Sequence, residues 1–250
     1  MSDPSSSHSP SVVLVHGAFA DGSSWNSVIE RLQARGVKVT APANPLRGIS
    51  VDSAYTASLF EQIPGPVLAV GHSYGGAVIT DAAARVDNVV GLVYVAAFAP
   101  DEGERLGEAT ATSKDALLSS ALVPRSDPSA DNGAPQVEFM IDPARVHDVF
   151  AADLSEEMAA LAGATQRPIA ELAFSEPCGM PAWKALPSWA VVALSDKAAG
   201  TDVVRSMAER AGAKTTEIEG SHVIMISRPD AVADVILNAL AAIAAPAPVG

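Results

Sequence analysis

Short apolar runs alternate with amphipathic helical patterns along most of this chain, and this alternation restricts its fold more than any other feature. Predicted strands lie at residues 11–16, 37–41, 66–70, 89–98, 188–194 and 214–218, and most of them are apolar runs. Helical patterns lie between or after them, at residues 23–35, 51–63, 77–85, 202–211 and 229–244. Such an order predicts an α/β fold with a mainly parallel sheet of about six strands and helices on both faces.

The alternation stops between about residues 100 and 187, where Pro, Ser, Asp and Ala are frequent and strong strand runs are missing. Helical patterns appear within this segment at residues 145–150, 155–164 and 167–174. We interpret it as a helical cap inserted after the fourth strand, so that residues 11–250 form a single domain. Residues 1–10, rich in Ser and Pro, are expected to be a disordered tail.

Charge and composition narrow the range of partners. The chain has 16 basic and 29 acidic residues, a formal net charge of −13, which disfavours nucleic acid and anionic membranes as partners. No apolar run reaches the roughly 18 residues that a membrane-spanning helix needs. The first ten residues lack the basic and apolar regions of a secretory signal, so we expect a cytoplasmic protein. A monomer and a homodimer both remain open.

Cofactor motifs are missing from the sequence. Cys178 is the single cysteine, so neither an intramolecular disulfide nor a Cys-based zinc site can form. We find no metal-ligand spacing, no dinucleotide-binding fingerprint and no phosphate-binding loop. The expectation is therefore a protein without a metal or an organic cofactor.

The segment Gly71-His72-Ser73-Tyr74-Gly75-Gly76 carries the strongest chemical signal. It follows a predicted strand and opens a predicted helix, which is the setting that the G-x-S-x-G motif requires. A sharp strand-to-helix turn strains its central residue and lifts the Ser73 hydroxyl above the sheet, at the positive end of a helix dipole. The motif predicts that Ser73 is a nucleophile.

A serine nucleophile needs a base, and a histidine base needs a carboxylate to orient it. His222 follows the last predicted strand, so it should lie at the same carboxyl edge of the sheet as Ser73. Asp196 follows the strand at residues 188–194 and lies at that edge too. Asp101, after the fourth strand, is the alternative carboxylate.

The transition state of acyl transfer also needs hydrogen-bond donors for its oxyanion. The backbone N–H of Tyr74, at the start of the helix, is one candidate. Ala18, in the loop after the first strand, is expected to supply the second N–H.

Together these residues make the sequence resemble the α/β-hydrolase superfamily. The segments that carry the resemblance are His16-Gly17-Ala18 with Trp25, the turn at residues 71–76, and Gly220-Ser221-His222. They are similar to a group of small esterases that also contains plant methylesterases and hydroxynitrile lyases. The lyases carry Thr at the position of Gly17 and Lys at that of Val223, so the resemblance favours hydrolysis.

The resemblance implies a serine hydrolase that cleaves a small, largely apolar carboxylic ester through an acyl-enzyme. Phe19, Phe139 and Trp183 are the expected pocket residues. A non-hydrolytic enzyme on the same scaffold, such as a lyase, a perhydrolase or a cofactor-free oxygenase, is the alternative, because a fold does not fix a function. A third hypothesis is a ligand-binding protein that keeps an unused set of catalytic residues.

Overall fold

The computed structural model describes residues 9–127 and 136–245 and confirms the predicted parallel sheet. Six strands lie in the order β2-β1-β3-β4-β8-β9, and every neighbouring pair is parallel. Their bounds are β1 Ser11–Val15, β2 Val39–Thr40, β3 Val67–His72, β4 Val89–Val95, β8 Ser188–Ala193 and β9 Lys214–Ile218. All carboxyl ends therefore meet at one edge of the sheet.

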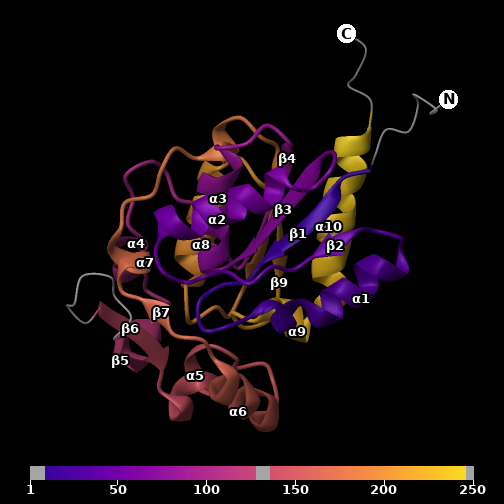
Figure 1. The fold of residues 1–250 in the computed structure, drawn as a ribbon. Helices are drawn as coiled ribbons and strands as arrows, with labels where there is room; N and C mark the ends of the chain where they lie inside the picture. The colour runs from indigo at the N-terminus through magenta and orange to yellow at the C-terminus, as the bar shows by residue number, and fades with distance from the viewer. Residues whose placement is uncertain (1–8, 128–135, 246–250) are drawn as a thin grey trace, which may run out of the picture.

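Helices cover both faces of this sheet (Figure 1). One face carries α1 (Asn26–Ala34) and α10 (Pro229–Ala244), which pack against each other. The other carries α2 (Ile49–Glu61), α3 (Tyr74–Ala83) and α8 (Thr201–Arg210). Shorter helices complete this part of the fold, namely η1 Gly22–Trp25 and α9 Ile224–Ser227.

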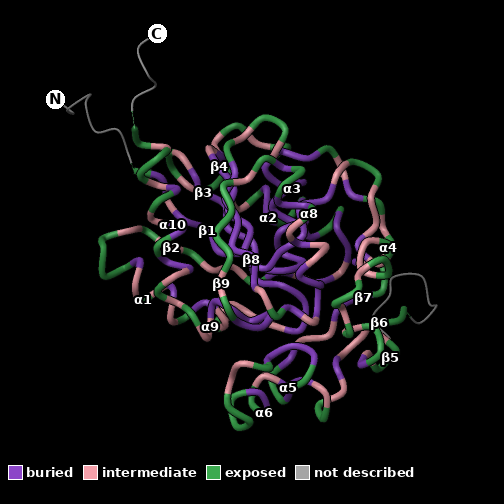
Figure 2. Tube along the Cα trace, turned by 180° about the vertical axis from the view of Figure 1, so that it is seen from behind, coloured by how far each residue is buried: buried purple, intermediate pink, exposed green. Residues whose placement is uncertain are grey.

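The core lies in the middle strands of the sheet, because helices exclude water from both of their faces. Every residue of β3 and of β8 is buried, and the buried segments gather at the centre of Figure 2. This explains why these strands appear in the sequence as continuous apolar runs rather than as alternating ones.

The segment between β4 and β8 is not purely helical. It holds α4 Leu106–Ala111, η2 Leu118–Ala121, η3 Pro143–Arg145, α5 Val146–Val149, α6 Glu156–Thr165, α7 Leu172–Ser175 and η4 Ala182–Lys184. It also holds a three-stranded antiparallel sheet of β5 (Leu122–Asp127), β6 (Gln136–Ile141) and β7 (Ile169–Ala170), which the sequence analysis missed. Residues 1–8 of the expected tail lie outside the described residues, and Pro10 is buried.

Two arginines attach this segment to the sheet domain. Arg47, before α2, forms ion pairs with Asp127 and Glu138 of the small antiparallel sheet, at 2.9 and 3.1 Å. Arg167, before β7, donates a hydrogen bond to the carbonyl of Asn44 at 2.9 Å. These contacts place the segment over the carboxyl edge of the large sheet. Among the described residues, none of the helices has both the length and the apolar character needed to cross a bilayer.

Candidate active site

Ser73 lies at the turn between β3 and α3 in a strained backbone conformation, with φ 53° and ψ −123°. Glycines make this turn possible. A Cβ on Gly71 would lie 2.5 Å from the carbonyl oxygen of Gly75, and one on Gly75 would collide with the carbonyl oxygen of Val15. Strain of this kind persists only where the surrounding structure enforces it. It holds Ser73 at the carboxyl edge of the sheet, as the motif predicts.

His222 and Asp196 form a buried pair at the same edge. The His222 Nδ1–H donates to Asp196 Oδ2 at 2.8 Å, and each residue is 1% exposed. The other carboxylate oxygen of Asp196 accepts the N–H groups of Ala198 and Ala199 at 2.9 and 3.0 Å. Both oxygens are therefore occupied, which fixes the carboxylate and leaves His222 Nε2 free for a proton transfer.

Asp101, the alternative carboxylate, lies in a different environment. It forms an ion pair with Lys184 at 2.5 Å, and its side chain is 34% exposed. The Lys184 hydrogen bond, helped by the N–H of Glu102, lowers the pKa of the Asp101 carboxyl. The structure thus places Asp196, and not Asp101, against His222.

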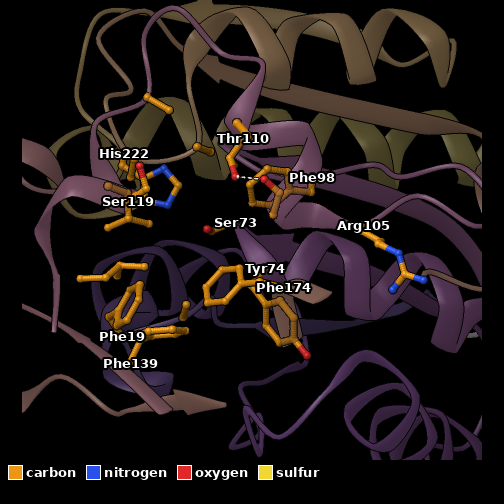
Figure 3. Close-up of a pocket in the computed structure, with 18 of the residues that line it drawn as sticks. Phe19, Ser73, Tyr74, Phe98, Arg105, Thr110, Ser119, Phe139, Phe174 and His222 are labelled. Carbon is orange, nitrogen blue, oxygen red and sulfur yellow. Dashed lines mark hydrogen bonds between the residues drawn. The ribbon is translucent and has the colours of Figure 1, made fainter. Parts of the chain in front are cut away.

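A cavity of about 380 Å³ opens above Ser73, and the His222 ring faces it (Figure 3). Ala18 and Tyr74 line the same cavity. Neither of their N–H groups has a hydrogen-bond partner within the described residues, so both are available to an incoming oxygen. The structure shows no hydrogen bond between Ser73 and His222, and such contacts often tighten only when substrate binds.

Five phenylalanines and Tyr74 contribute to the cavity wall. Phe19 and Phe139 line it, as the sequence analysis expects. Three further rings were not assigned to it from the sequence, namely those of Phe98, Phe150 and Phe174. The charged lining residues are Arg105, Glu108 and Glu171, and Arg105 lies at the end far from His222 (Figure 3).

The expectation for Trp183 is wrong, because its ring does not line this cavity. The indole N–H donates to the carbonyl of Pro100 at 2.9 Å. The ring lies beneath the cationic groups of Lys184 and Arg210, whose distances from its centre are 5.4 and 6.0 Å. This tryptophan therefore helps to anchor the two ends of the inserted segment.

His72 is a neighbour of the site to which the sequence analysis gave no role. It is fully buried, and its Nε2–H donates to the backbone carbonyl of His222 at 2.9 Å. Burial, reinforced by the nearby His222, holds the pKa of His72 well below its usual range, so the ring stays neutral. A neutral ring can act as this donor without placing a second charge beside His222. The only signal in the sequence was its position next to Ser73.

The backbone and the side-chain hydroxyl of Tyr74 lie in different surroundings. Its N–H faces the cavity, whereas its hydroxyl donates to Asp52 Oδ2 at 2.7 Å, away from Ser73. Asp52 is fully buried and also accepts the N–H of Arg47 at 3.1 Å. Burial raises the pKa of the Asp52 carboxyl, and the hydrogen bonds from Arg47 and Tyr74 oppose that rise.

The inserted segment also contacts the loop that carries His222. Asp153 accepts a short hydrogen bond from the hydroxyl of Ser221. The Phe150 ring lies 5.1 Å from the His222 ring, centre to centre. The residues between α5 and α6 therefore support the histidine from the side opposite to the sheet.

Besides Ser73, the thiol of Cys178 is a possible nucleophile. It is buried and does not line the cavity. Burial, with smaller contributions from Asp81, Glu104 and Glu176, raises the pKa of its thiol to about 12. A thiol in this state is unreactive at neutral pH. No cluster of side chains suited to hold a metal ion is present in the part of the chain that the structure describes.

Comparison with known proteins identifies the family. The sequence model of the α/β-hydrolase family matches residues 12–235, so the chain belongs to the α/β-hydrolase family. The carbendazim-hydrolysing esterase of Nocardioides is 33% identical over 125 residues, covering 45% of this chain and 48% of that protein. Lipase LipV of Mycobacterium tuberculosis is 34% identical over 120 residues, covering 44% of each. The chain thus matches about half the length of these relatives.

Solved structures support the same fold over nearly the whole chain. Polyneuridine aldehyde esterase superposes with a TM-score of 0.76 at 21% identity, covering 93% of this chain and 99% of that one. A pyrethroid hydrolase from Sphingobium faniae gives a TM-score of 0.76 at 22% identity, covering 93% and 98%. At these identities the likeness shows the fold alone.

Proposed function

We propose that this protein is a serine hydrolase that cleaves small, largely apolar carboxylic esters through an acyl-enzyme. The observation that carries the proposal is the buried His222–Asp196 pair, which lies beside a strained Ser73 at the floor of an aromatic cavity. Relatives named as an esterase, a lipase and a pyrethroid hydrolase support the same reaction class.

In the first half of the reaction, the Ser73 oxygen attacks the ester carbonyl carbon while its proton passes to His222 Nε2. The negative charge that develops on the carbonyl oxygen is held by the N–H groups of Ala18 and Tyr74. Losing one such donor typically costs about 10²–10³ in rate. Asp196 stabilises the positive charge on the His222 ring. Collapse of the intermediate breaks the bond to the alcohol oxygen, which takes the proton from His222.

In the second half, a water molecule attacks the acyl group on Ser73, and His222 takes its proton. The second tetrahedral intermediate uses the same two N–H groups. Its collapse returns the proton to the Ser73 oxygen and releases the carboxylic acid. No net charge or electron is left on the protein, so the cycle needs no cofactor.

The proposal is tested by intact-mass measurement after exposure to a fluorophosphonate. Wild-type protein should gain one adduct, and Ser73→Ala should gain none, because the unreactive thiol of Cys178 offers no second site. The same pair of proteins is then assayed for release of acid from ethyl acetate. An adduct on Ser73→Ala, or unchanged turnover in it, would contradict the assignment of Ser73.

The same protein preparation can be used to distinguish the lyase alternative from the esterase. A Cβ at position 17 would lie 2.7 Å from the Cβ of Ser73, so this structure has no room for the Thr found in hydroxynitrile lyases. Release of cyanide from a cyanohydrin should therefore be far slower than ester hydrolysis. Cyanide release faster than ester hydrolysis would favour the lyase over the esterase.

A further inference from the structure

A second pocket, of about 200 Å³, lies beneath α6. Side chains of α6 form one wall, and residues of the loop after β1 and of α9 form the other. The apolar lining residues are Phe19, Ala20, Phe150, Leu154, Met158, Leu161, Ala162, Val223, Met225 and Ile226. Met158 and Leu161 are 47% and 68% exposed, so the pocket opens to solvent along α6. Its polar lining residues are Asp21, Ser23, Ser24 and Thr165, and no cationic side chain lines it within the described residues.

This pocket and the catalytic cavity share two lining residues within the described part of the chain. Phe19 and Phe150 line both spaces. Their rings meet edge to face, with centres 6.2 Å apart and planes at 87°. A ligand that occupied both spaces would have to pass between these two side chains. The two spaces are therefore adjacent, with these two side chains between them.

The chemistry of ester cleavage decides which part of a substrate reaches this partition. His222 must protonate the leaving oxygen, so the alcohol part of the ester begins beside the His222 ring. Phe150 lies 5.1 Å from that ring, and Val223, the next residue along the chain, lines the second pocket. The acyl part attaches to the same carbon and is left with the rest of the catalytic cavity, whose lining includes Phe139 and Phe174.

We infer that the second pocket is a binding site for the alcohol part of an extended apolar ester, entered past the Phe19–Phe150 pair. This inference rests on the proposed function. It names the substrate class as esters of long or bulky apolar alcohols, and it assigns specificity for the alcohol to Ala162, Leu161 and Met158.

Two isomeric esters test the assignment, because they place the same apolar chain on opposite sides of the ester bond. Nonyl acetate carries the chain on its alcohol, and methyl decanoate carries it on its acyl group. Ethyl acetate is the small reference. Ala162 is partly buried on the wall of the pocket, so Ala162→Phe should fill the space without contacting Ser73 or His222.

We expect Ala162→Phe to lower kcat/KM for nonyl acetate at least tenfold, since one lost methylene contact in a pocket is already worth about tenfold or more. The values for methyl decanoate and ethyl acetate should change less than about twofold, because neither ester places an apolar chain in the second pocket and so neither loses a contact there. Leu161→Asp, at a position too exposed to affect folding, should act in the same direction. Val51→Asp removes an exposed apolar side chain from α2, away from both pockets, and should leave all three values unchanged.

The outcomes separate this inference from the proposed function. Equal losses on nonyl acetate and methyl decanoate, or no loss on either, would overturn the second pocket as an alcohol site while ethyl acetate turnover upholds the hydrolase. A selective loss on methyl decanoate would overturn the orientation and make the pocket an acyl site. If wild-type protein hydrolyses none of the three esters and takes up no fluorophosphonate, the proposed function fails, and the inference fails with it.

Discussion

Replacing Tyr74 by Phe separates the two functions of that residue. The substitution keeps the aromatic ring and the backbone N–H that faces the cavity, and it removes only the hydroxyl that donates to Asp52 at 2.7 Å. Asp52 is fully buried, so water cannot replace the lost donor. The expected result is a less stable protein with nearly unchanged chemistry.

The size of the effect follows from the charge on the acceptor. A hydrogen bond to a charged group contributes about 1.5–3 kcal/mol. For a protein of this size each kcal/mol corresponds to about 2–4 °C in Tm, so the expected fall is about 3–12 °C. Tyr94→Phe is the matched control, because that hydroxyl is equally buried but contacts the neutral hydroxyl of Thr80 at 2.8 Å. It should cost about 1 kcal/mol.

The loss in Tyr74→Phe should also depend on pH. Burial raises the pKa of Asp52 above its ordinary 3.8, and without the Tyr74 hydroxyl it rises further. A carboxyl whose pKa is raised on folding makes the folded state less stable as pH increases through that window. The difference in stability between wild type and variant is therefore largest at a pH above the raised pKa of Asp52, and it narrows as the pH falls through that raised pKa.

Urea denaturation of wild type, Tyr74→Phe and Tyr94→Phe at neutral and at mildly acidic pH measures both effects. Ethyl acetate turnover of the folded proteins measures the chemistry. Unchanged stability together with a hundredfold fall in kcat would refute the reasoning, because it would place the Tyr74 hydroxyl in the reaction itself. A loss of stability in Tyr74→Phe that does not vary with pH would refute the argument that the Asp52 carboxyl titrates with a raised pKa.

Three further predictions concern the carboxylates and the turn. Asp196→Asn should lower kcat by about 10⁴ because it favours the wrong tautomer of the histidine, whereas Asp101→Asn should change kcat less than about twofold. Gly17→Ala should cost about 1–3 kcal/mol in urea denaturation, because the new methyl group meets the nucleophile's Cβ at 2.7 Å. Asp153→Asn should weaken the support from Ser221. Burial alone would raise the pKa of Asp153, but hydrogen bonds, first that from Ser221, hold it below its ordinary 3.8. The stability difference should therefore be full at neutral pH and disappear as the pH falls through that lowered value.

The parallel sheet was predictable because its middle strands are buried on both faces. Continuous apolar runs such as β3 and β8 stand out without any alignment, and the bounds of β9 and α10 match the expected ranges. The inserted antiparallel sheet was not predictable in the same way. β5 contains Pro124 and β6 is largely exposed or half-buried, so neither carries a strong strand pattern. Their structure comes from pairing with each other, which local sequence does not encode.

The candidate site was also predictable only in part. Positions at the carboxyl ends of strands could be assigned from strand order, and the structure brings Asp196 and His222 into contact there. The cavity wall could not be assigned, because it depends on how the inserted segment packs. Phe150 and Phe174 join Phe139 at the cavity, whereas Trp183 faces a different set of neighbours.

The state of Cys178 has a practical consequence for measuring motion. Since the native thiol is buried and protonated at neutral pH, a cysteine introduced on the surface would be the one position open to a thiol-directed fluorophore or spin label. Leu161, at the mouth of the second pocket, is exposed enough to accept such a label. Distances from there to a second labelled site on α2 would report whether α6 moves relative to the sheet during turnover, in the otherwise native chain.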